Sequence, residues 1–379
     1  MQHKFGALDL IRAGLQDLDR ARTLFDELHN DGIDGDRMRL LLATLEKACD
    51  PDIALSNLVG IIKVMQSQGK DFTNIIADEN SFVRLITVLG VSDEMGKLMR
   101  FRPELVEAAA NDACESHLYN HEQRRAHVLK SVGADPNDHT MPTASLPLAE
   151  AATALRKTYR KQLAAIMAQD ATANDPIEIQ PRISTELSDL ADAALEGALA
   201  IARHEVDGSE HVRFAIIGMG KLGAQELNYV SDVDLIYVVE PADMDTNGMA
   251  LSRIGTKMAT TLQRVCQSVI MGVAEPTLWQ IDGGLRPEGK DGPLVRRLES
   301  HEAYYEQWAE NWEFQALLKA RPVAGDTDLG QAYMDMTRPF VWTASKRDNF
   351  VYDCQQMRKR VEDLNSQPAE RPRNQTRQG

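Results

Sequence analysis

Hydrophobic residues in the first third of the chain recur at spacings of three and four, which predicts helices over about residues 8–130. The segments Asp50-Pro51-Asp52 and Phe101-Arg102-Pro103 interrupt this spacing, as is typical of helix ends and turns. The stretch 131–145 holds Gly133 and two prolines, a composition that predicts a linker. The N-terminal region is therefore expected to be helical and to end in a linker.

Two amphipathic helices are expected next, over residues 148–166 and about 184–204. The pattern then changes to short runs of apolar and β-branched residues that predict strands, namely 212–217, 233–239 and 277–282. Helical spacing returns over 249–271, with Gly272 as the predicted C-terminal cap, and again from Ser300 to about Leu364. Residues 366–379 contain a lone alanine as apolar residue and predict a disordered tail.

These elements predict an α+β protein, with a helical N-terminal region followed by a domain that contains a small mixed sheet. The expected parts are a helical domain at 1–130, a linker with packing helices at 131–205, a domain with the sheet at 206–330, a C-terminal helix at 331–365 and the tail at 366–379. A length of 379 residues is compatible with more than one domain.

The composition of the chain argues against several classes of function. The chain has 42 Lys and Arg against 57 Asp and Glu, a formal charge of −15, which disfavours a general grip on nucleic acid. The four cysteines form no CxxC motif, which argues against a disulfide framework or structural zinc and favours a reducing compartment. The sequence contains no uninterrupted apolar run of about 18 residues, so no membrane span is expected. Its first residues lack the apolar core of a signal peptide. The expected location is the cytoplasm, with no membrane partner.

The first predicted strand leads into a glycine motif, Gly218-Met219-Gly220-Lys221-Leu222-Gly223, which matches GxGxxG. Glu240 follows 22 residues after Gly218, so a dinucleotide-binding site is one interpretation. That site needs a helix of several turns before the second strand. Only nine residues, Ala224 to Asp232, are available, which disfavours this interpretation.

An acidic pair begins the second predicted strand. Positions i and i+2 of a strand point to one face, so Asp232 and Asp234 project together. Two adjacent carboxylates repel unless a cation lies between them, and hard oxygen ligands suit Mg²⁺. Asp282 ends the third predicted strand and would join them if the two strands are neighbours, giving a site for two metal ions. A solvated turn or helix cap is the structural alternative for an Asp-x-Asp pair.

Three blocks make the sequence similar to a known family. They are residues 218–229 running into Ser231-Asp232-Val233-Asp234, residues 282–289 with 292–295, and residues 312–322. They resemble the glutamine synthetase adenylyltransferase/adenylyl-removing enzyme family, which belongs to the polymerase-β-like nucleotidyltransferases. The resemblance implies that the domain expected at 206–330 is a nucleotidyltransferase catalytic domain of that fold.

The resemblance also implies roles for individual residues. Asp232, Asp234 and Asp282 would be the metal ligands, and Asp282 would also help to activate the attacking oxygen. The implied nucleotide- and phosphate-binding residues are Gly220, Lys221, Ser231, Arg286, Lys319 and Arg321. Lys319 and Arg321 are expected at a helix end, and ordinary surface charge is the alternative for the basic residues.

The full family enzyme has two catalytic halves that act on glutamine synthetase, and this chain has one unit. Residues 226–229 and 314–322 resemble the adenylyl-removing half, which releases AMP from a tyrosine by phosphorolysis. The implied partners are glutamine synthetase, an adenine nucleotide and phosphate. Alternatives are ATP-dependent adenylylation, or a regulatory fragment that binds glutamine synthetase or a PII-type signal protein. The family continues into a further helical domain, so the chain is expected to be truncated.

Overall fold

The structure, a computed structural model, describes residues 5–70, 72, 78–110, 119–243 and 247–366. The described residues form two compact units. The helical unit takes residues from 1–205, 225–231 and 261–279, and the sheet unit takes residues from 206–224, 232–260 and 280–379. The segment 225–231 thus belongs to the helical unit although both of its flanks belong to the sheet unit.

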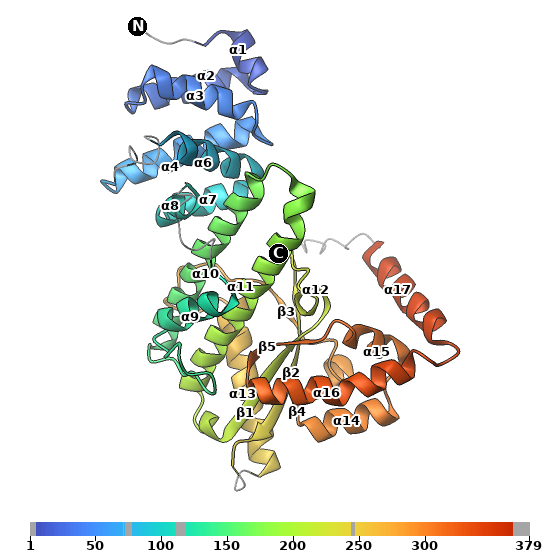
Figure 1. The fold of residues 1–379 in the computed structure, drawn as a ribbon. Helices are drawn as coiled ribbons and strands as arrows, with labels where there is room; N and C mark the ends of the chain where they lie inside the picture. Colours follow the sequence, from blue (N-terminus) through green and yellow to red (C-terminus); the bar gives the residue numbers. More distant parts are fainter. Residues whose placement is uncertain (1–4, 71, 73–77, 111–118, 244–246, 367–379) are drawn as a thin grey trace, which may run out of the picture. The chain divides into compact units, whose positions relative to one another are not determined.

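The helical unit begins with a series of helices along the N-terminal part of the chain (Figure 1), and several of them start at a capping aspartate. Asp17, Asp34, Asp50 and Asp78 accept a hydrogen bond from a backbone N–H in the first turn of the following helix. The helices are α1 (Ala7–Arg12), α2 (Leu18–Asn30), α3 (Gly35–Leu45), α4 (Pro51–Ser67), α6 (Glu79–Val91), α7 (Asp93–Phe101), α8 (Glu104–Ala110) and α9 (His121–Ser131). The apolar faces of these helices, α9 excepted, form one core together with Ala164, Met167 and Ala168. The expected helical N-terminal region is confirmed.

Two long helices, α10 (Leu148–Ala171) and α11 (Pro176–Glu205), pack against each other and against α9. Buried Arg124 of α9 joins them, because its guanidinium donates to Gln162 on α10 and to Glu186 on α11 at 3.1 and 2.9 Å. α11 begins eight residues before the predicted Ser184. Pro181 lies inside the helix, and Asp175 accepts from N–H groups of the first turn.

The sheet unit contains a mixed sheet of five strands. They are β1 (Val212–Gly218), β2 (Val233–Pro241), β3 (Ile281–Asp282), β4 (Val295–Arg296) and β5 (Arg321–Gly325). The order is β3-β2-β1-β5, with β4 also paired to β2. β1 is antiparallel to β2 and to β5, whereas β3 and β4 are parallel to β2. The α+β class with a small mixed sheet is therefore confirmed.

Helices cover the two faces of this sheet. One face packs Ala215, Ile217, Ile236 and Val238 against α14, α15 and α16. The other face meets α13, whose Gly255 lies against Val239 of β2. The helices and 3₁₀ turns are η2 (Ser209–His211), α12 (Gly220–Gly223), α13 (Gly248–Gln267), η3 (Gly289–Asp291), α14 (Leu298–Gln307), α15 (Asn311–Leu317), α16 (Thr327–Ala344) and α17 (Phe350–Ser366). The last residues of α13 belong to the helical unit.

The predicted strand 277–282 is wrong over most of its length, since only Ile281–Asp282 is a strand. The preceding backbone groups are paired elsewhere. Arg160 Nη2 donates to the carbonyls of Pro276 and Thr277 at 2.8 and 2.6 Å, and the N–H of Leu278 donates to the carbonyl of Cys266. These groups are therefore not available for strand pairing.

The helix predicted from Ser300 to Leu364 is also wrong as a continuous element. β5 interrupts it, and α16 and α17 follow where one C-terminal helix was expected. β5 contains Pro322, which lacks a backbone donor and disfavours a strand in sequence reasoning. The structure accommodates this proline on the edge of the sheet, where the pairing with β1 shifts between Ile216 and Ile217. Strand β4, two residues long, was not predicted at all.

Gly272 is not the cap of the predicted helix, because α13 ends at Gln267. Gly272 adopts a φ of +85° in a later turn. The end of α13 is held by buried Arg156, whose guanidinium donates to the carbonyls of Val265 and Ser268 and also to that of Glu275. The Arg156 side chain of α10 thus provides hydrogen bonds to carbonyls at the end of α13, a role that a C-terminal glycine cap has in many helices.

No helix in the described part of the chain is long and apolar enough to span a membrane. The predicted disordered tail falls almost entirely outside the described residues. Ser366, its first residue, is the last residue of α17.

Candidate active site at the edge of the sheet

Two of the predicted acids meet on neighbouring strands. β2 and β3 run parallel, with Val233 opposite Ile281 and Asp234 opposite Asp282. Register partners in adjacent strands project to the same face of a sheet, so the two carboxylates lie side by side. Along β2, Asp234 shares its face with Ile236 and Val238, which pack in the core under α14, α15 and α16. The acids therefore stand at the end of a packed apolar face.

The three acids act on one another electrostatically. Burial raises the pKa of half-buried Asp234 above its usual range, and the neighbouring charges of Asp282 and Asp232 raise it further. Lys221, on α12, acts in the opposite direction. Asp282 is exposed, and its Oδ1 accepts a hydrogen bond of 2.7 Å from the N–H of Gly284. The site combines one partly desolvated carboxylate with two that are open to solvent.

The glycine turn is shaped around Asp234. The N–H of Met219 donates to the backbone carbonyl of Asp234 at 2.9 Å. Gly220 has a φ of +53°, and a Cβ at this position would lie 2.6 Å from Asp234 Oδ2. Both observations require glycine there, the first through backbone conformation and the second through close approach. The turn brings backbone next to the carboxylate, as a site for phosphate oxygens would need.

The same region excludes the dinucleotide interpretation. A dinucleotide fold joins parallel strands through a helix of several turns. Here β1 and β2 are antiparallel, and α12 between them has four residues. Glu240, the candidate ribose ligand, instead accepts from the N–H of Leu298 and forms an ion pair with Arg297 at 3.0 Å. The dinucleotide interpretation is wrong.

Two predicted basic residues take unexpected positions. Arg321 is the first residue of β5 and does not lie at a helix end. Its Nε and Nη2 donate to the carbonyls of Gly223 and Leu222 at 3.3 and 3.1 Å, which ties β5 to the glycine turn. Lys319 is exposed beyond the end of α15, and its carbonyl oxygen would lie 1.8 Å from a Cβ at Gly223. The side chain of Arg321 thus supports the glycine turn, and the backbone of Lys319 packs against the same turn.

Arg286 organises its own loop. Its guanidinium donates to the carbonyls of Gly283, Lys290 and Gly292, at 2.7 Å for the shortest of these contacts. These bonds close the loop that follows Asp282. A role in stabilising charge on a phosphoryl group stays a prediction, and it would require Arg286 to share its donors with a ligand.

Ser231 ends the segment 225–231, which belongs to the helical unit. Within that unit Gln225 Nε2 donates to Asp189, the N–H of Leu227 donates to Ser188, and the hydroxyl of Tyr229 donates to Asp170. Gln225 has a φ of +57°, a rare conformation for a residue with a side chain. Sequence reasoning missed these supporting residues. They lie on α10 and α11, and no local motif connects them to the segment.

A further group of possible ligands lies in the helical unit. His121, Asp189 and Asp192 offer ligand atoms within 4.8 Å of one another. A hydrogen bond from the His121 ring to the Asp192 carboxylate raises the pKa of His121, which favours the protonated ring and competes with metal binding. Sequence reasoning found no histidine cluster, since these residues lie on two helices that are separate in sequence.

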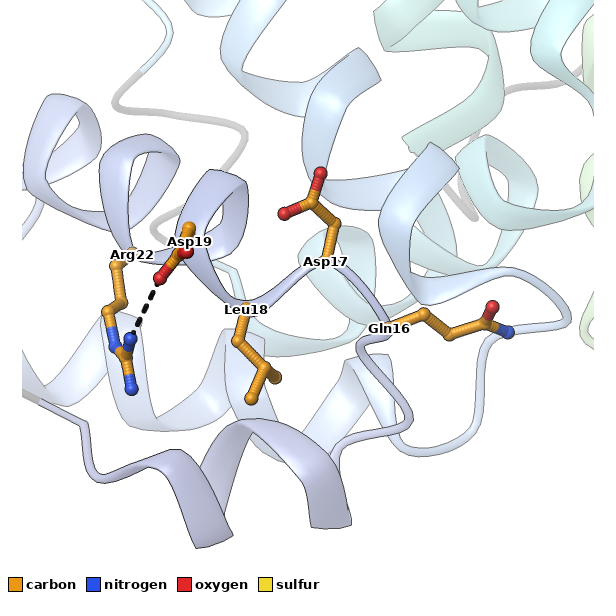
Figure 2. Close-up of a pocket in the computed structure, with 5 residues that line it drawn as sticks. All are labelled: Gln16, Asp17, Leu18, Asp19 and Arg22. Carbon is orange, nitrogen blue, oxygen red and sulfur yellow. Dashed lines mark hydrogen bonds and ion pairs between the residues drawn. The ribbon is translucent and has the colours of Figure 1, made fainter.

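The structure also has a wide, open pocket of about 580 Å³ at the start of α2. Figure 2 shows its lining residues, Gln16, Asp17, Leu18, Asp19 and Arg22. Arg22 pairs with Asp19 at 3.0 Å, and Asp17 caps α2. These polar groups serve the helix itself, and all five residues belong to the helical unit. The pocket therefore offers no chemistry comparable to the three acids of the sheet unit.

Comparison with known proteins agrees with the resemblance seen in the sequence. Residues 82–336 match the model of the family described as glutamate-ammonia ligase adenylyltransferase. Curated relatives carry the name bifunctional glutamine synthetase adenylyltransferase/adenylyl-removing enzyme. One from Bifidobacterium longum is 74% identical over 95% of this chain and 34% of its own length. One from Cutibacterium acnes is 40% identical over 94% of this chain and 35% of its own. The chain spans about a third of the length of these relatives.

Proposed function

Because the chain belongs to the glutamate-ammonia ligase adenylyltransferase family, we propose that its sheet unit is a nucleotidyltransferase domain that removes AMP from an adenylylated tyrosine of glutamine synthetase. The observation that carries this proposal is the parallel pairing of β2 with β3, which sets Asp234 opposite Asp282. The residues concerned are Asp232, Asp234 and Asp282, with Gly220, Lys221, Ser231, Arg286, Lys319 and Arg321 as nucleotide- and phosphate-binding candidates.

The proposed reaction is phosphorolysis. An oxygen of inorganic phosphate attacks the phosphorus of the tyrosyl-AMP, and a new phosphorus–oxygen bond forms to give ADP. The bond from phosphorus to the tyrosine oxygen breaks, and that oxygen takes up a proton to give the free hydroxyl. Asp282, which is exposed, would accept a proton from the attacking phosphate. The backbone at Gly220, which lies close to the Asp234 carboxylate, would contact phosphate oxygens.

The acids fit Mg²⁺. Their ligand atoms are hard carboxylate oxygens, the type that this ion prefers. Burial raises the pKa of Asp234, the charges of Asp282 and Asp232 raise it further, and a divalent cation between the carboxylates would lower it. Asp232, Asp234 and Asp282 would hold the ion or a pair of ions. When bound, Mg²⁺ would neutralise charge on the phosphoryl oxygens.

ATP-dependent adenylylation is a second candidate, because the relatives' name joins both activities. The two reactions differ in their products. Adenylylated glutamine synthetase with phosphate and Mg²⁺ should yield ADP if the chain removes AMP. Unmodified glutamine synthetase with ATP and Mg²⁺ should yield pyrophosphate if the chain adds it. Binding of glutamine synthetase with neither product would refute both and would favour a regulatory fragment.

Matched substitutions test the acids. Asp234→Asn should lower the metal-dependent rate by at least about 100-fold, since even indirect partners of a metal contribute about 10–100-fold. Asp328→Asn is the control, because Asp328 is exposed in the first turn of α16. Circular dichroism should show intact folding for both variants. An Asp234→Asn protein that keeps the activity of the Asp328→Asn protein would remove Asp234 from the site.

A further inference from the structure

A second cavity lies entirely within the helical unit. Its volume is about 130 Å³, several times the roughly 10–15 Å³ that one water molecule requires. Its charged lining residues are Arg102, Glu104, Lys157, Arg160, Lys161 and Glu275. Four of these are cationic and two are acidic, so the lining has a net charge of +2 at neutral pH, in a chain whose formal charge is −15. This local reversal of charge favours an anionic ligand.

Glu275 is the buried wall of this cavity. Its side chain is 1% exposed, and its Oε1 is paired with Arg102 Nε. Its Oε2 has no hydrogen-bond partner among the described residues. Buried polar atoms in proteins are nearly always paired, so this oxygen calls for a donor that the described residues do not provide. A ligand for the cavity should therefore carry an O–H or N–H group as well as negative charge.

Two lysines form the open wall. Lys157 and Lys161 are exposed and lie four residues apart on α10, and therefore on one face of the helix. Neither has an ion-pair or hydrogen-bond partner in the part of the chain that the structure describes. Like charges at this spacing are unfavourable, and an anion between them would relieve the repulsion. Arg160 is already committed to the carbonyls of Pro276 and Thr277.

We propose that this cavity binds inorganic phosphate as the hydrogen phosphate dianion. Its two negative charges match the net charge of the lining, and its P–O–H group can donate to Glu275 Oε2. The terminal torsion of a glutamate is broad, so a small rotation can turn Oε2 toward that donor. Sulfate has similar size and charge but no proton at neutral pH, and it would place an acceptor against a carboxylate. The site should therefore discriminate phosphate from sulfate.

The site is independent of the proposed catalytic acids. A phosphate at those acids would need a divalent metal to offset their negative charge. Titration calorimetry in EDTA therefore reports the cavity alone. The unmodified chain should bind phosphate saturably, and sulfate or chloride at the same ionic strength should not compete. The measurement contains neither a divalent metal nor glutamine synthetase, so its result does not depend on whether the proposed activity is correct.

Substitutions test the contribution of the two lysines and that of Glu275 separately. Lys157→Ala/Lys161→Ala should weaken phosphate binding by about tenfold or more, because contacts to two charged groups are lost. Lys130→Ala, an exposed lysine on α9, should leave it unchanged. Glu275→Gln should remove the preference over sulfate, because an amide can donate to either anion. Equal binding of sulfate and phosphate by the unmodified chain, or normal binding by the double-lysine variant, would overturn the proposal. The exposed lysines keep this test available if Glu275→Gln does not fold.

Discussion

Lowering the pH should destabilise the sheet unit through one buried histidine, His301 of α14. Its ring stacks on Tyr305, with centroids 6.0 Å apart, and meets Tyr333 edge-on at 5.2 Å. Burial lowers the pKa of His301 to about 3, and the charge of Arg296 acts in the same direction, while a backbone contact of Tyr237 opposes them. The folded protein therefore favours the neutral form of the His301 ring.

The magnitude follows from linkage. The unfolded chain binds a proton at His301 below about pH 6.5, whereas the folded chain does so only near pH 3. The unfolded state therefore holds more protons in this window, and stability falls as the pH falls through it. Between about pH 7 and about pH 5 this single group should remove about 2 kcal/mol from the free energy of unfolding. Little of the loss should occur above pH 7.

His301→Gln isolates the effect, because glutamine is polar but does not titrate. Any cost of the substitution that is independent of pH cancels when each protein is compared with itself at two pH values. Urea unfolding should be followed by tryptophan fluorescence, since Trp308, Trp312 and Trp342 belong to the sheet unit. His29→Gln, at an exposed position, is the control. If unmodified and His301→Gln proteins lose stability in parallel between the two pH values, His301 is not the responsible group.

Gly220→Ala should cost about 1–2 kcal/mol from its positive φ and should also displace the Asp234 carboxylate, which would lie 2.6 Å from the new Cβ. ADP release and thermal melting measure the two effects, and a variant with unchanged activity would show that the turn does not constrain the acid. Arg156→Ala should destabilise the helical unit by about 3 kcal/mol or more, because three buried carbonyls lose their donor. Lys157→Ala, one residue along the same helix and exposed, should change stability by less than about 0.5 kcal/mol, and equal effects in urea unfolding would contradict this account.

The features that sequence reasoning predicted correctly are local ones. The apolar runs 212–217 and 233–239, the glycines between them and the spacing of Asp232 and Asp234 depend on neighbours within a few residues. The long helix α10 was visible for the same reason, because its apolar stripe repeats along one segment. Sequence similarity to a family then connected these local features to a nucleotidyltransferase fold.

The errors occur where distant groups pair. Residues 277–282 were predicted to form a strand, but Arg160, more than a hundred positions away, binds the carbonyls of Pro276 and Thr277. Arg156 likewise ends α13 from another helix, so the local signal at Gly272 was misleading. β5 went unpredicted because Pro322 disfavours a strand unless that strand lies at an edge, and edge position is a property of the assembled sheet.

The candidate site divides in the same way. The sequence by itself predicted which residues would carry the proposed chemistry, because Asp232, Asp234 and the glycine turn form one continuous motif. Only the tertiary structure decided that Asp282 stands opposite Asp234, since the parallel register of β2 and β3 joins strands that are about forty residues apart in the chain. It likewise decided the buried environment that raises the pKa of Asp234. Pairing and burial depend on which segments meet in space, and a local pattern of side chains does not contain that information.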